Sequence, residues 1–175
     1  MSASTSGSFI AFEGGEGAGK STQVRLLAKA LTAAGHEVVT TLEPGDTEVG
    51  RQLRQILLGH HTGTIDSKTE ALLYAADRAE HVASVVRPAL DRGAVCITDR
   101  YIDSSIAYQG AGRVLEPDDI ARISMWATGD LWPDLTIVLD IDPVVGLTRF
   151  SAPADRLEAE PLAFHQRVRE HFLAL

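Results

Sequence analysis

Eight consecutive residues near the N-terminus, Gly14–Ser21, have the spacing G-x-x-x-x-G-K-S. They follow a short apolar run, Phe9–Phe12, and precede a stretch with helical periodicity, Gln23–Leu31. In a strand–loop–helix setting the glycines let backbone N–H groups surround an anion at a helix N-terminus. The lysine adds positive charge, and the serine hydroxyl can bind Mg²⁺. A glycine-rich turn can also simply join a strand to a helix, but the Lys-Ser pair favours a phosphate loop that binds a nucleoside triphosphate.

Composition agrees with one globular domain. The chain has 175 residues, of which 45% are hydrophobic and 23% charged, close to the usual globular values. We expect a flexible tail over residues 1–7 and a single domain over 8–175. No apolar run reaches the roughly 20 residues of a membrane span, and no signal peptide is visible. The sequence therefore predicts a cytoplasmic protein with no membrane partner.

Charge and cysteine content narrow the partners. The formal net charge is −8, which argues against a broad nucleic-acid surface but not against binding a single nucleotide. The single cysteine, Cys96, lies in the apolar run Ala94–Ile97. A buried structural thiol is the better interpretation, and a disulfide framework is excluded.

Predicted strands and helices alternate along the chain. The expected strands cover residues 8–13, 38–42, 94–98 and 135–141, and the expected helices 19–34, 47–58, 68–91, 103–109 and 117–128. Pro88 is expected to kink the long helix, and Asp142-Pro143 to begin a further one. The uninterrupted apolar run 135–141 predicts a strand covered on both faces. This order is typical of an α/β fold, a parallel sheet flanked by helices on both faces.

Polar landmarks follow the predicted strands, where ligands of such sheets collect. These are the phosphate loop, Glu43–Gly45, Asp99–Tyr101 and the segment after Asp142. At the end of a buried strand, the Asp99 carboxylate can meet Mg²⁺ while Arg100 reaches a phosphate. An incidental ion pair at a strand end is the alternative.

Tyr74 and Arg78 are four residues apart in a helical stretch and share a face. A flat ring can stack on a base, and a guanidinium can donate to an exocyclic oxygen. A packed tyrosine beside a surface arginine is the common structural meaning of such a pair.

Together these motifs resemble the thymidylate kinases of bacteria, from about residue 9 to residue 175. The resemblance rests on five blocks: residues 12–23, Glu43–Gly45 with Gly50 and Arg54, Leu73–Arg78, Asp99–Tyr101 with Ser104 and Ala107–Gly110, and Gly146–Val168. It implies a nucleoside monophosphate kinase of the P-loop NTPase type that phosphorylates dTMP to dTDP with ATP and Mg²⁺. It also implies a homodimer, for which the apolar positions of the long helix (Leu72, Ala75, Ala79, Val82, Val86 and Ala89) offer a surface.

The resemblance also implies residue roles. The donor phosphates of ATP are expected on the loop residues Gly14, Gly15, Glu16, Gly17, Ala18, Gly19, Lys20, Ser21 and Thr22, and the metal on Ser21, Asp99 and Glu16. The acceptor dTMP is expected on Glu43, Arg54, Tyr74, Arg78, Asp99, Arg100, Ser104, Tyr108 and Gln109. The phosphoryl group in transfer is expected to be stabilised by Lys20, Arg100, Arg149 and Arg156, the last two from a lid at about 147–158. A phosphate oxygen of dTMP is already anionic near neutral pH, so no catalytic base is expected.

The chain departs from the family pattern at three places. Leu42 and Asp46 stand where an arginine and a second glycine are usual, and an aspartate near a phosphate is repulsive. The lid segment Phe150–Ala154 is short. The chain stops at Leu175, inside an amphipathic helix, where family members usually continue with another strand and helix.

Two other functions remain open from sequence alone. The first is a kinase of another deoxynucleotide or of a deoxynucleoside, and the second is a non-catalytic module that only binds nucleotides. A signalling GTPase is excluded because the sequence contains no asparagine, which its guanine-reading Asn-Lys-x-Asp motif requires.

Overall fold

The computed structural model describes residues 7–60, 63–113, 115–149 and 154–175. Four parallel strands form its sheet in the order β2-β3-β1-β4. Their bounds are Ser8–Glu13 for β1, Val38–Leu42 for β2, Val95–Asp99 for β3 and Leu135–Val138 for β4. The predicted parallel sheet is confirmed, and β1 and β3, which precede the two strongest motifs, are neighbours in it.

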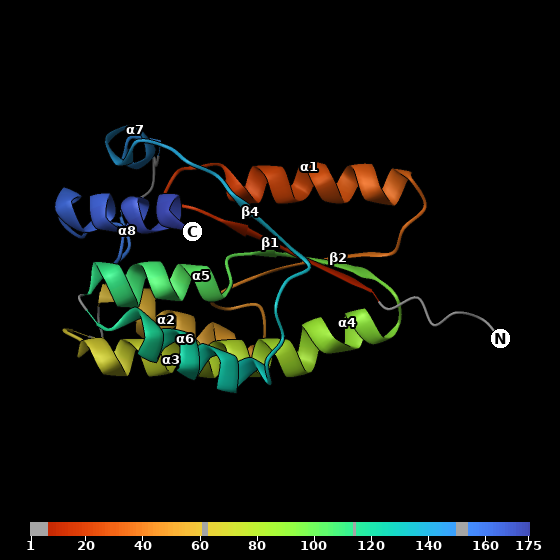
Figure 1. The fold of residues 1–175 in the computed structure, drawn as a ribbon, viewed down its shortest axis with the longest axis horizontal. Helices are drawn as coiled ribbons and strands as arrows, with labels where there is room; N and C mark the ends of the chain where they lie inside the picture. Colours follow the sequence, from red (N-terminus) through yellow and green to blue (C-terminus); the bar gives the residue numbers. More distant parts are fainter. Residues whose placement is uncertain (1–6, 61–62, 114, 150–153) are drawn as a thin grey trace.

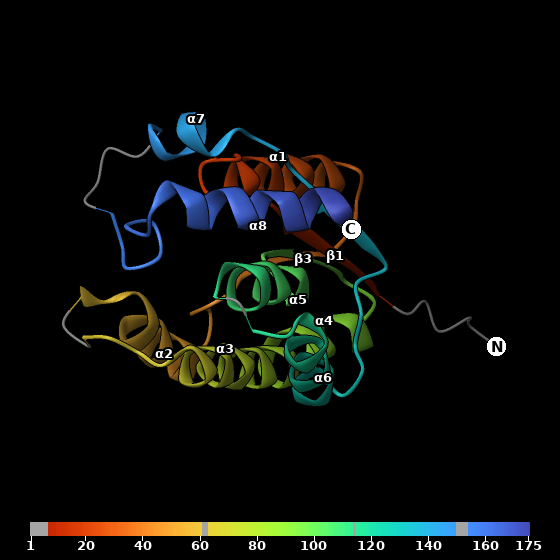
Figure 2. The same ribbon diagram turned by 60° about the vertical axis from the view of Figure 1, so that its left-hand side comes forward.

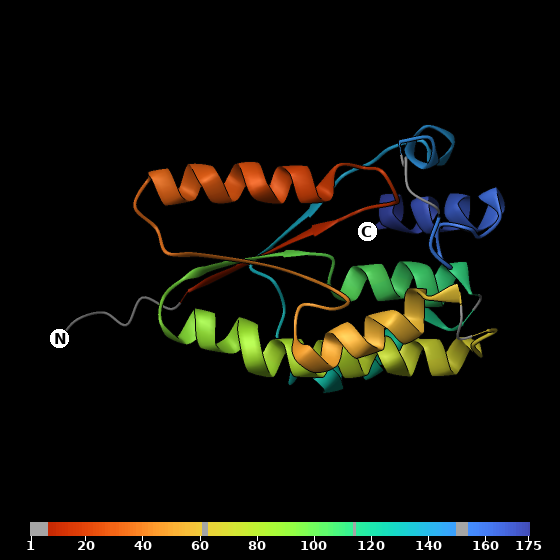
Figure 3. The same ribbon diagram turned by 180° about the vertical axis from the view of Figure 1, so that it is seen from behind.

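Helices cover the sheet on both sides (Figure 1). α1 lies on one face and α2 to α6 on the other, as the view from behind also shows (Figure 3). α8 lies between the α1 layer and α5, beyond the end of β1, the strand that precedes the phosphate loop (Figure 2). The bounds are Lys20–Ala33 for α1, Glu48–Leu58 for α2, Ser67–His81 for α3, Arg87–Asp91 for α4, Ile102–Ser105 for α5, Pro117–Thr128 for α6, Pro143–Leu147 for α7 and Leu162–Ala174 for α8.

The long predicted helix over 68–91 is continuous but not uniform. Between α3 and α4 it contains a π-helical segment, η2, over Val82–Val86. Pro88 lies in the first turn of α4, directly after this π-helical segment, so the irregularity lies next to the residue whose missing N–H disrupts the helical hydrogen bonds. A second π-helical segment, η3 over Ile106–Gly112, continues α5. π-helical turns are often found at functional sites, and η3 supplies two of the predicted site residues.

The last strand was predicted over 135–141 but ends at Val138, and the prediction that both its faces are covered was wrong. β4 is a short edge strand, and the side chains of Leu135 and Val138 are 51% and 36% exposed. In the described part of the chain β4 pairs with β1 only. Leu135 and Val138 are an odd number of positions apart, so their side chains point to opposite faces of the sheet and both faces are partly exposed. Its continuous apolar run therefore does not indicate burial on both faces.

The apolar surface proposed on the long helix also needs correction. Val82, Val86 and Ala89 are buried in the core of the same chain, as is Ala75 nearby. Of the large side chains in that set only Leu72, at 56%, is exposed. Cys96 is buried as expected, and burial raises the pKa of its thiol to about 12. Among the described residues no helix is long and apolar enough to cross a membrane.

Candidate active site

The phosphate loop joins β1 to α1 in a conformation that only glycine tolerates at two points. Gly14 has a φ of 130° and Gly17 a φ of 69°, values that L side chains rarely adopt. A Cβ atom would lie 2.2 Å from the carbonyl oxygen of Leu139 at Gly14 and of Gly146 at Gly17. The loop is thus packed closely against the segments that follow β4.

Lys20 begins α1 and turns back over this loop. Its Nζ donates hydrogen bonds to the carbonyl oxygens of Gly14 and Gly15, at 3.0 and 2.9 Å. Burial, followed by the neighbouring Arg100 guanidinium, lowers the pKa of Lys20 to about 8. A cation held in this way has lost much of its hydration, which strengthens its attraction for a phosphate.

Ser21 and Asp99 form the candidate metal site. Because β1 and β3 are adjacent and Phe12 pairs with Asp99, the Ser21 hydroxyl can donate to Asp99 Oδ2, at 2.5 Å. A hydroxyl beside a carboxylate fits Mg²⁺, which prefers oxygen ligands and takes the remainder from water and substrate phosphates. Within the described ranges no cluster of three or more His, Cys, Asp or Glu could hold a metal alone.

A cavity of about 420 Å³ lies over the phosphate loop. Its wall includes Asp99, Arg100 and Arg149 and six of the predicted donor residues: Glu16, Gly17, Gly19, Lys20, Ser21 and Thr22. The other three, Gly14, Gly15 and Ala18, do not line it. The Arg149 Nη1 donates to the Gly17 carbonyl oxygen at 2.9 Å, so this predicted lid arginine lies where donor phosphates would bind. Residues 150–153 of the predicted lid fall outside the described residues.

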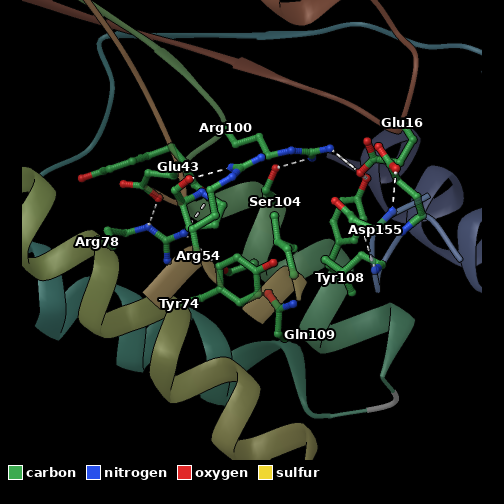
Figure 4. Close-up of a pocket in the computed structure, with 16 residues that line it drawn as sticks. Glu16, Glu43, Arg54, Tyr74, Arg78, Arg100, Ser104, Tyr108, Gln109 and Asp155 are labelled. Carbon is green, nitrogen blue, oxygen red and sulfur yellow. Dashed lines mark hydrogen bonds and ion pairs between the residues drawn. The ribbon is translucent and has the colours of Figure 1, made fainter. Parts of the chain in front are cut away.

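A second cavity, of about 120 Å³, shares part of its wall with the first. Figure 4 shows the residues that line it. It is lined by Tyr74, Arg78, Tyr108 and Gln109, which the resemblance implies at the base and sugar, and by Ser104, which was also expected at dTMP. Glu16, Glu43, Arg54 and Arg100 line both cavities. Two arginines therefore stand at the boundary where the phosphates of two ligands would meet.

Arg100 is held firmly at this boundary. Its φ of 75° is unusual for a residue with a side chain, and its backbone N–H donates to the Phe12 carbonyl oxygen at 2.9 Å. Its Nη2 lies 2.5 Å from Glu16 Oε1 and 3.2 Å from the Tyr108 hydroxyl. Burial alone would raise the pKa of Glu16, but Arg100 and Lys20 outweigh it and hold that pKa below its ordinary value. Glu16, expected at the metal, thus points to the arginine instead.

Glu13 is a site residue that the sequence analysis missed. Its fully buried carboxylate accepts hydrogen bonds from the backbone N–H groups of Tyr101 and Ser104 and from the Ser104 hydroxyl. These bonds cap α5 directly after Arg100. Burial is the largest cause that raises the pKa of Glu13, to about 7. The sequence offered one signal for a role of Glu13 in the site: it stands immediately before Gly14, at the end of β1.

Arg78 lines the second cavity, but most of its N–H groups donate to other residues of the protein. It donates from Nε to Glu43 at 2.8 Å and from the two Nη atoms to the Ser124 hydroxyl, the Tyr101 carbonyl oxygen and the Ser105 hydroxyl. Four of its five N–H groups are thus engaged. Glu43 also accepts from His81 at 2.7 Å, so its side chain supports Arg78.

The two departures near Glu43 have different outcomes. Asp46 lines neither cavity, and its Oδ2 accepts from the Thr41 hydroxyl at 2.6 Å. The expected repulsion of a phosphate by Asp46 is therefore avoided. Leu42 does line the donor cavity and is 40% exposed there.

Arg156 lies apart from both cavities. Its Nε donates to the Leu57 carbonyl oxygen at 2.6 Å, and its Nη2 to the buried carboxylate of Glu70. The structure therefore does not bring it together with Lys20, Arg100 and Arg149, and its assigned part in phosphoryl transfer stays a prediction.

Known proteins resemble this chain in sequence and in fold. The family model described as thymidylate kinase matches residues 12–175. The thymidylate kinases of Clavibacter michiganensis and Cutibacterium acnes are 56% and 52% identical to this chain over 97% of its length, covering 81% and 82% of theirs. A crystal structure of thymidylate kinase from Ehrlichia chaffeensis superposes with a TM-score of 0.79 at 33% identity, over 96% of this chain and 80% of that one. Both the family match and these relatives show that the chain belongs to the thymidylate kinase family.

Proposed function

We propose that this enzyme transfers the γ-phosphoryl group of ATP to dTMP, giving dTDP and ADP as a step toward dTTP. The observation that carries the proposal is the meeting of two cavities at Arg54 and Arg100. One cavity is built on a phosphate loop, and the other is lined by groups suited to a nucleobase. A transferase needs this juxtaposition because its catalysis consists largely of positioning two phosphates and neutralising their charge.

On the donor side the loop backbone, Lys20 and Arg149 hold the phosphates of ATP. Mg²⁺ at Ser21 and Asp99 supplies charge neutralisation at those phosphates when bound. Lys20 reaches them from its position over Gly14 and Gly15. Arg149, anchored to Gly17, adds the positive charge that the phosphate loop lacks because it carries Glu16 and no arginine.

On the acceptor side Arg54 and Arg100 bind the phosphate of dTMP. Arg54 Nη1 donates to the Pro44 carbonyl oxygen at 2.7 Å, which leaves other N–H groups for a ligand. An anionic phosphate oxygen of dTMP attacks the γ-phosphorus, and the bond to ADP breaks. Because that oxygen carries no proton to remove, no general base is needed.

Tyr74, Arg78 and Gln109 form the base end of the acceptor cavity. Tyr74 supplies a ring face for stacking, and Arg78 keeps one N–H group for the exocyclic oxygen of thymine. The Gln109 Nε2 group donates a hydrogen bond to Glu70 at 3.0 Å. The side-chain carbonyl oxygen of Gln109 is left to accept a hydrogen bond. Cytosine presents an amino group opposite Arg78, so a donor there would be left unpaired.

The acceptor cavity also weighs against the alternatives. A deoxynucleoside has no phosphate to occupy Arg54 and Arg100, and a module that only binds ATP needs no second cavity. The test is a panel of nucleosides and nucleoside monophosphates incubated with the enzyme and ATP-Mg²⁺, with ADP release as the signal. We expect dTMP to give the highest kcat/KM, and a nucleoside preferred over dTMP would overturn the proposal.

We further propose that the enzyme acts in the cytoplasm as a homodimer. A groove of about 570 Å³ runs between α3 and α6, beside Leu72. Trp126, also on α6, is 85% exposed, whereas tryptophan side chains are highly buried on average. Light scattering at micromolar concentration should give twice the chain mass, and Trp126→Glu should return it to the monomer mass. A monomeric wild-type protein would contradict this assembly.

A further inference from the structure

Glu70, in the first turn of α3, is a fully buried carboxylate that the proposed mechanism does not use. It does not line either of the two cavities described above. A carboxylate almost never occupies such a position unless charged partners compensate it. Its partners therefore indicate what it does.

Four hydrogen bonds converge on Glu70. Oε1 accepts from Gln109 Nε2 at 3.0 Å and from Arg113 Nε at 3.1 Å. Oε2 accepts from Arg113 Nη2 at 3.1 Å and from Arg156 Nη2. Burial by itself would raise the pKa of Glu70, but these donors outweigh it and hold that pKa below its ordinary value. The group is therefore an ionised acceptor with its lone pairs in use.

The donors come from separate parts of the chain that wall the acceptor cavity. Gln109 belongs to η3, and its side chain lines the cavity. Arg156 lies in the segment that contributes Asp155, Leu157 and Glu158 to the same wall. Its backbone N–H donates to the Leu58 carbonyl oxygen at 3.2 Å, which ties that segment to the end of α2.

Arg113 is the third residue that donates hydrogen bonds to Glu70. It follows η3 directly, binds Glu70 through two nitrogen atoms, and pairs with Glu160 at 2.5 Å. Its guanidinium lies 5.0 Å from the centre of the Phe164 ring in α8. One carboxylate thus connects α3, η3 and the segment before α8.

We propose that Glu70 is a positioning residue for the acceptor cavity. Glu70 orients the Gln109 amide and holds the side chain of Arg156, whose segment forms part of the cavity wall. Arg156 then acts on dTMP binding through Glu70 and Leu57 and does not contact the phosphoryl group. This inference rests on the proposed function, because it concerns the dTMP end of the same site.

The test compares Glu70→Gln, Arg156→Gln and the double variant. Glu70→Gln keeps the shape but replaces one acceptor oxygen with a donor that faces arginines. Arg156→Gln removes the two hydrogen bonds of a partly exposed side chain, to Glu70 and to the Leu57 carbonyl oxygen, so it remains informative if Glu70→Gln does not fold. Glu37→Gln is the matched control, since Glu37 pairs with Arg92 on the surface.

The readouts are kcat, KM for dTMP and for ATP, and the Kd of dTMP by calorimetry. Loss of a hydrogen bond to a charged group predicts that each single variant raises KM and Kd for dTMP by about tenfold. The KM for ATP and the kcat should stay within about twofold of wild type. The double variant should be no weaker than the worse single one, because both remove the same unit. Glu37→Gln should match wild type.

Two results would overturn the inference. One is a wild-type KM and Kd for dTMP in folded Glu70→Gln or in Arg156→Gln. The other is a loss of about 100-fold in kcat in Arg156→Gln at unchanged KM for dTMP, which is the signature of a phosphoryl contact. Failure of the proposed function looks different, since the wild-type enzyme itself would then neither phosphorylate nor bind dTMP.

Discussion

Nη2 of Arg100 lies 2.5 Å from Oε1 of Glu16, and the Arg100 guanidinium lies 4.9 Å from the centre of the Tyr108 ring. These contacts hold the cation at the boundary of the two cavities. The positive φ of Arg100 is a strain that persists only where the surroundings determine the conformation fully. Glu13, Phe12 and Glu16 provide those surroundings. A charge fixed in this way needs little reorganisation during phosphoryl transfer.

Replacement of Lys20 by Ala should abolish transfer while the fold remains intact. The side chain is the charged group aimed at the donor phosphates, and loss of one such group costs about 100-fold or more in kcat. Steady-state kinetics on the purified variant measure the effect, and circular dichroism checks the fold. Near-normal turnover in a folded Lys20→Ala protein would contradict the assignment of the donor site.

Affinity for ATP should fall as the pH rises above 8. The pKa of Lys20 is about 8, so at higher pH the amine is neutral and must take up a proton when the phosphates bind. The Kd of ATP should then increase by up to about tenfold per pH unit. Calorimetry between pH 7 and 9.5 measures this slope. The control is Lys20→Ala, which should lack it; an equal slope in that variant would exclude Lys20 as the cause.

Glu13 should make the enzyme less stable as the pH rises from about 4.5 to 7. Its pKa is raised from 4.5 to about 7, so the folded protein holds a proton that the unfolded chain has already released. The stability from this proton is fully present below pH 4.5 and is lost as the pH rises through 7. Between pH 5 and 8 the loss amounts to about 2–3 kcal/mol. Urea unfolding should show this loss in wild type but not in Glu13→Gln, and equal changes in both proteins would refute it.

Tyr74 and Arg78 should contribute differently to base recognition. Tyr74→Ala should weaken all pyrimidine monophosphates, since stacking tolerates any base and is worth about 1–3 kcal/mol. Arg78→Ala should lower kcat/KM for dTMP more than for dCMP. If folded Arg78→Ala keeps the dTMP preference, Arg78 is structural and the thymine position is wrong.

The buried ion pair between Arg78 and Glu43 complicates that experiment, because removing one partner costs about 3–5 kcal/mol of stability. Ser105→Ala is therefore the companion variant. It removes one hydroxyl that accepts from Arg78 and leaves the ion pair in place. We expect the Ser105→Ala protein to be stable and to lose less of its preference for dTMP over dCMP than Arg78→Ala does. An unchanged preference would show that the orientation of Arg78 matters little.

The strands before the phosphate loop and before Asp99 could be predicted because local patterns determine them. Short apolar runs followed by glycine or by charged residues indicated β1 and β3 with little error in bounds. The same reasoning located β4, but it placed the end of the strand three residues too late and wrongly expected both faces to be covered. A continuous apolar run does not reveal whether a strand lies in the middle of a sheet or at its edge. Strand order depends on the whole fold.

The site was predictable where one motif supplies it and not where distant residues meet. Lys20, Ser21 and Arg100 follow from the loop and strand-end motifs. Glu70 contacts Arg113, which is 43 positions away in the sequence, and Arg156, which is 86 positions away. No local sequence pattern predicts these contacts. Arg156 is an example: its place in a lid motif suggested a phosphate contact, but the motif gives no sign of its bond to the buried carboxylate of Glu70 in α3.

The central claim is that the two cavities form one site with Arg54 and Arg100 between them. A compound that joins adenosine and thymidine through five phosphates at their 5′ oxygens tests this directly by calorimetry. If both ends bind at once, the linked ligand gains from effective concentration and should bind at least about 100-fold more tightly than ATP or dTMP alone. Arg100→Ala should remove most of that gain. A linked ligand that binds no better than ATP would contradict the account.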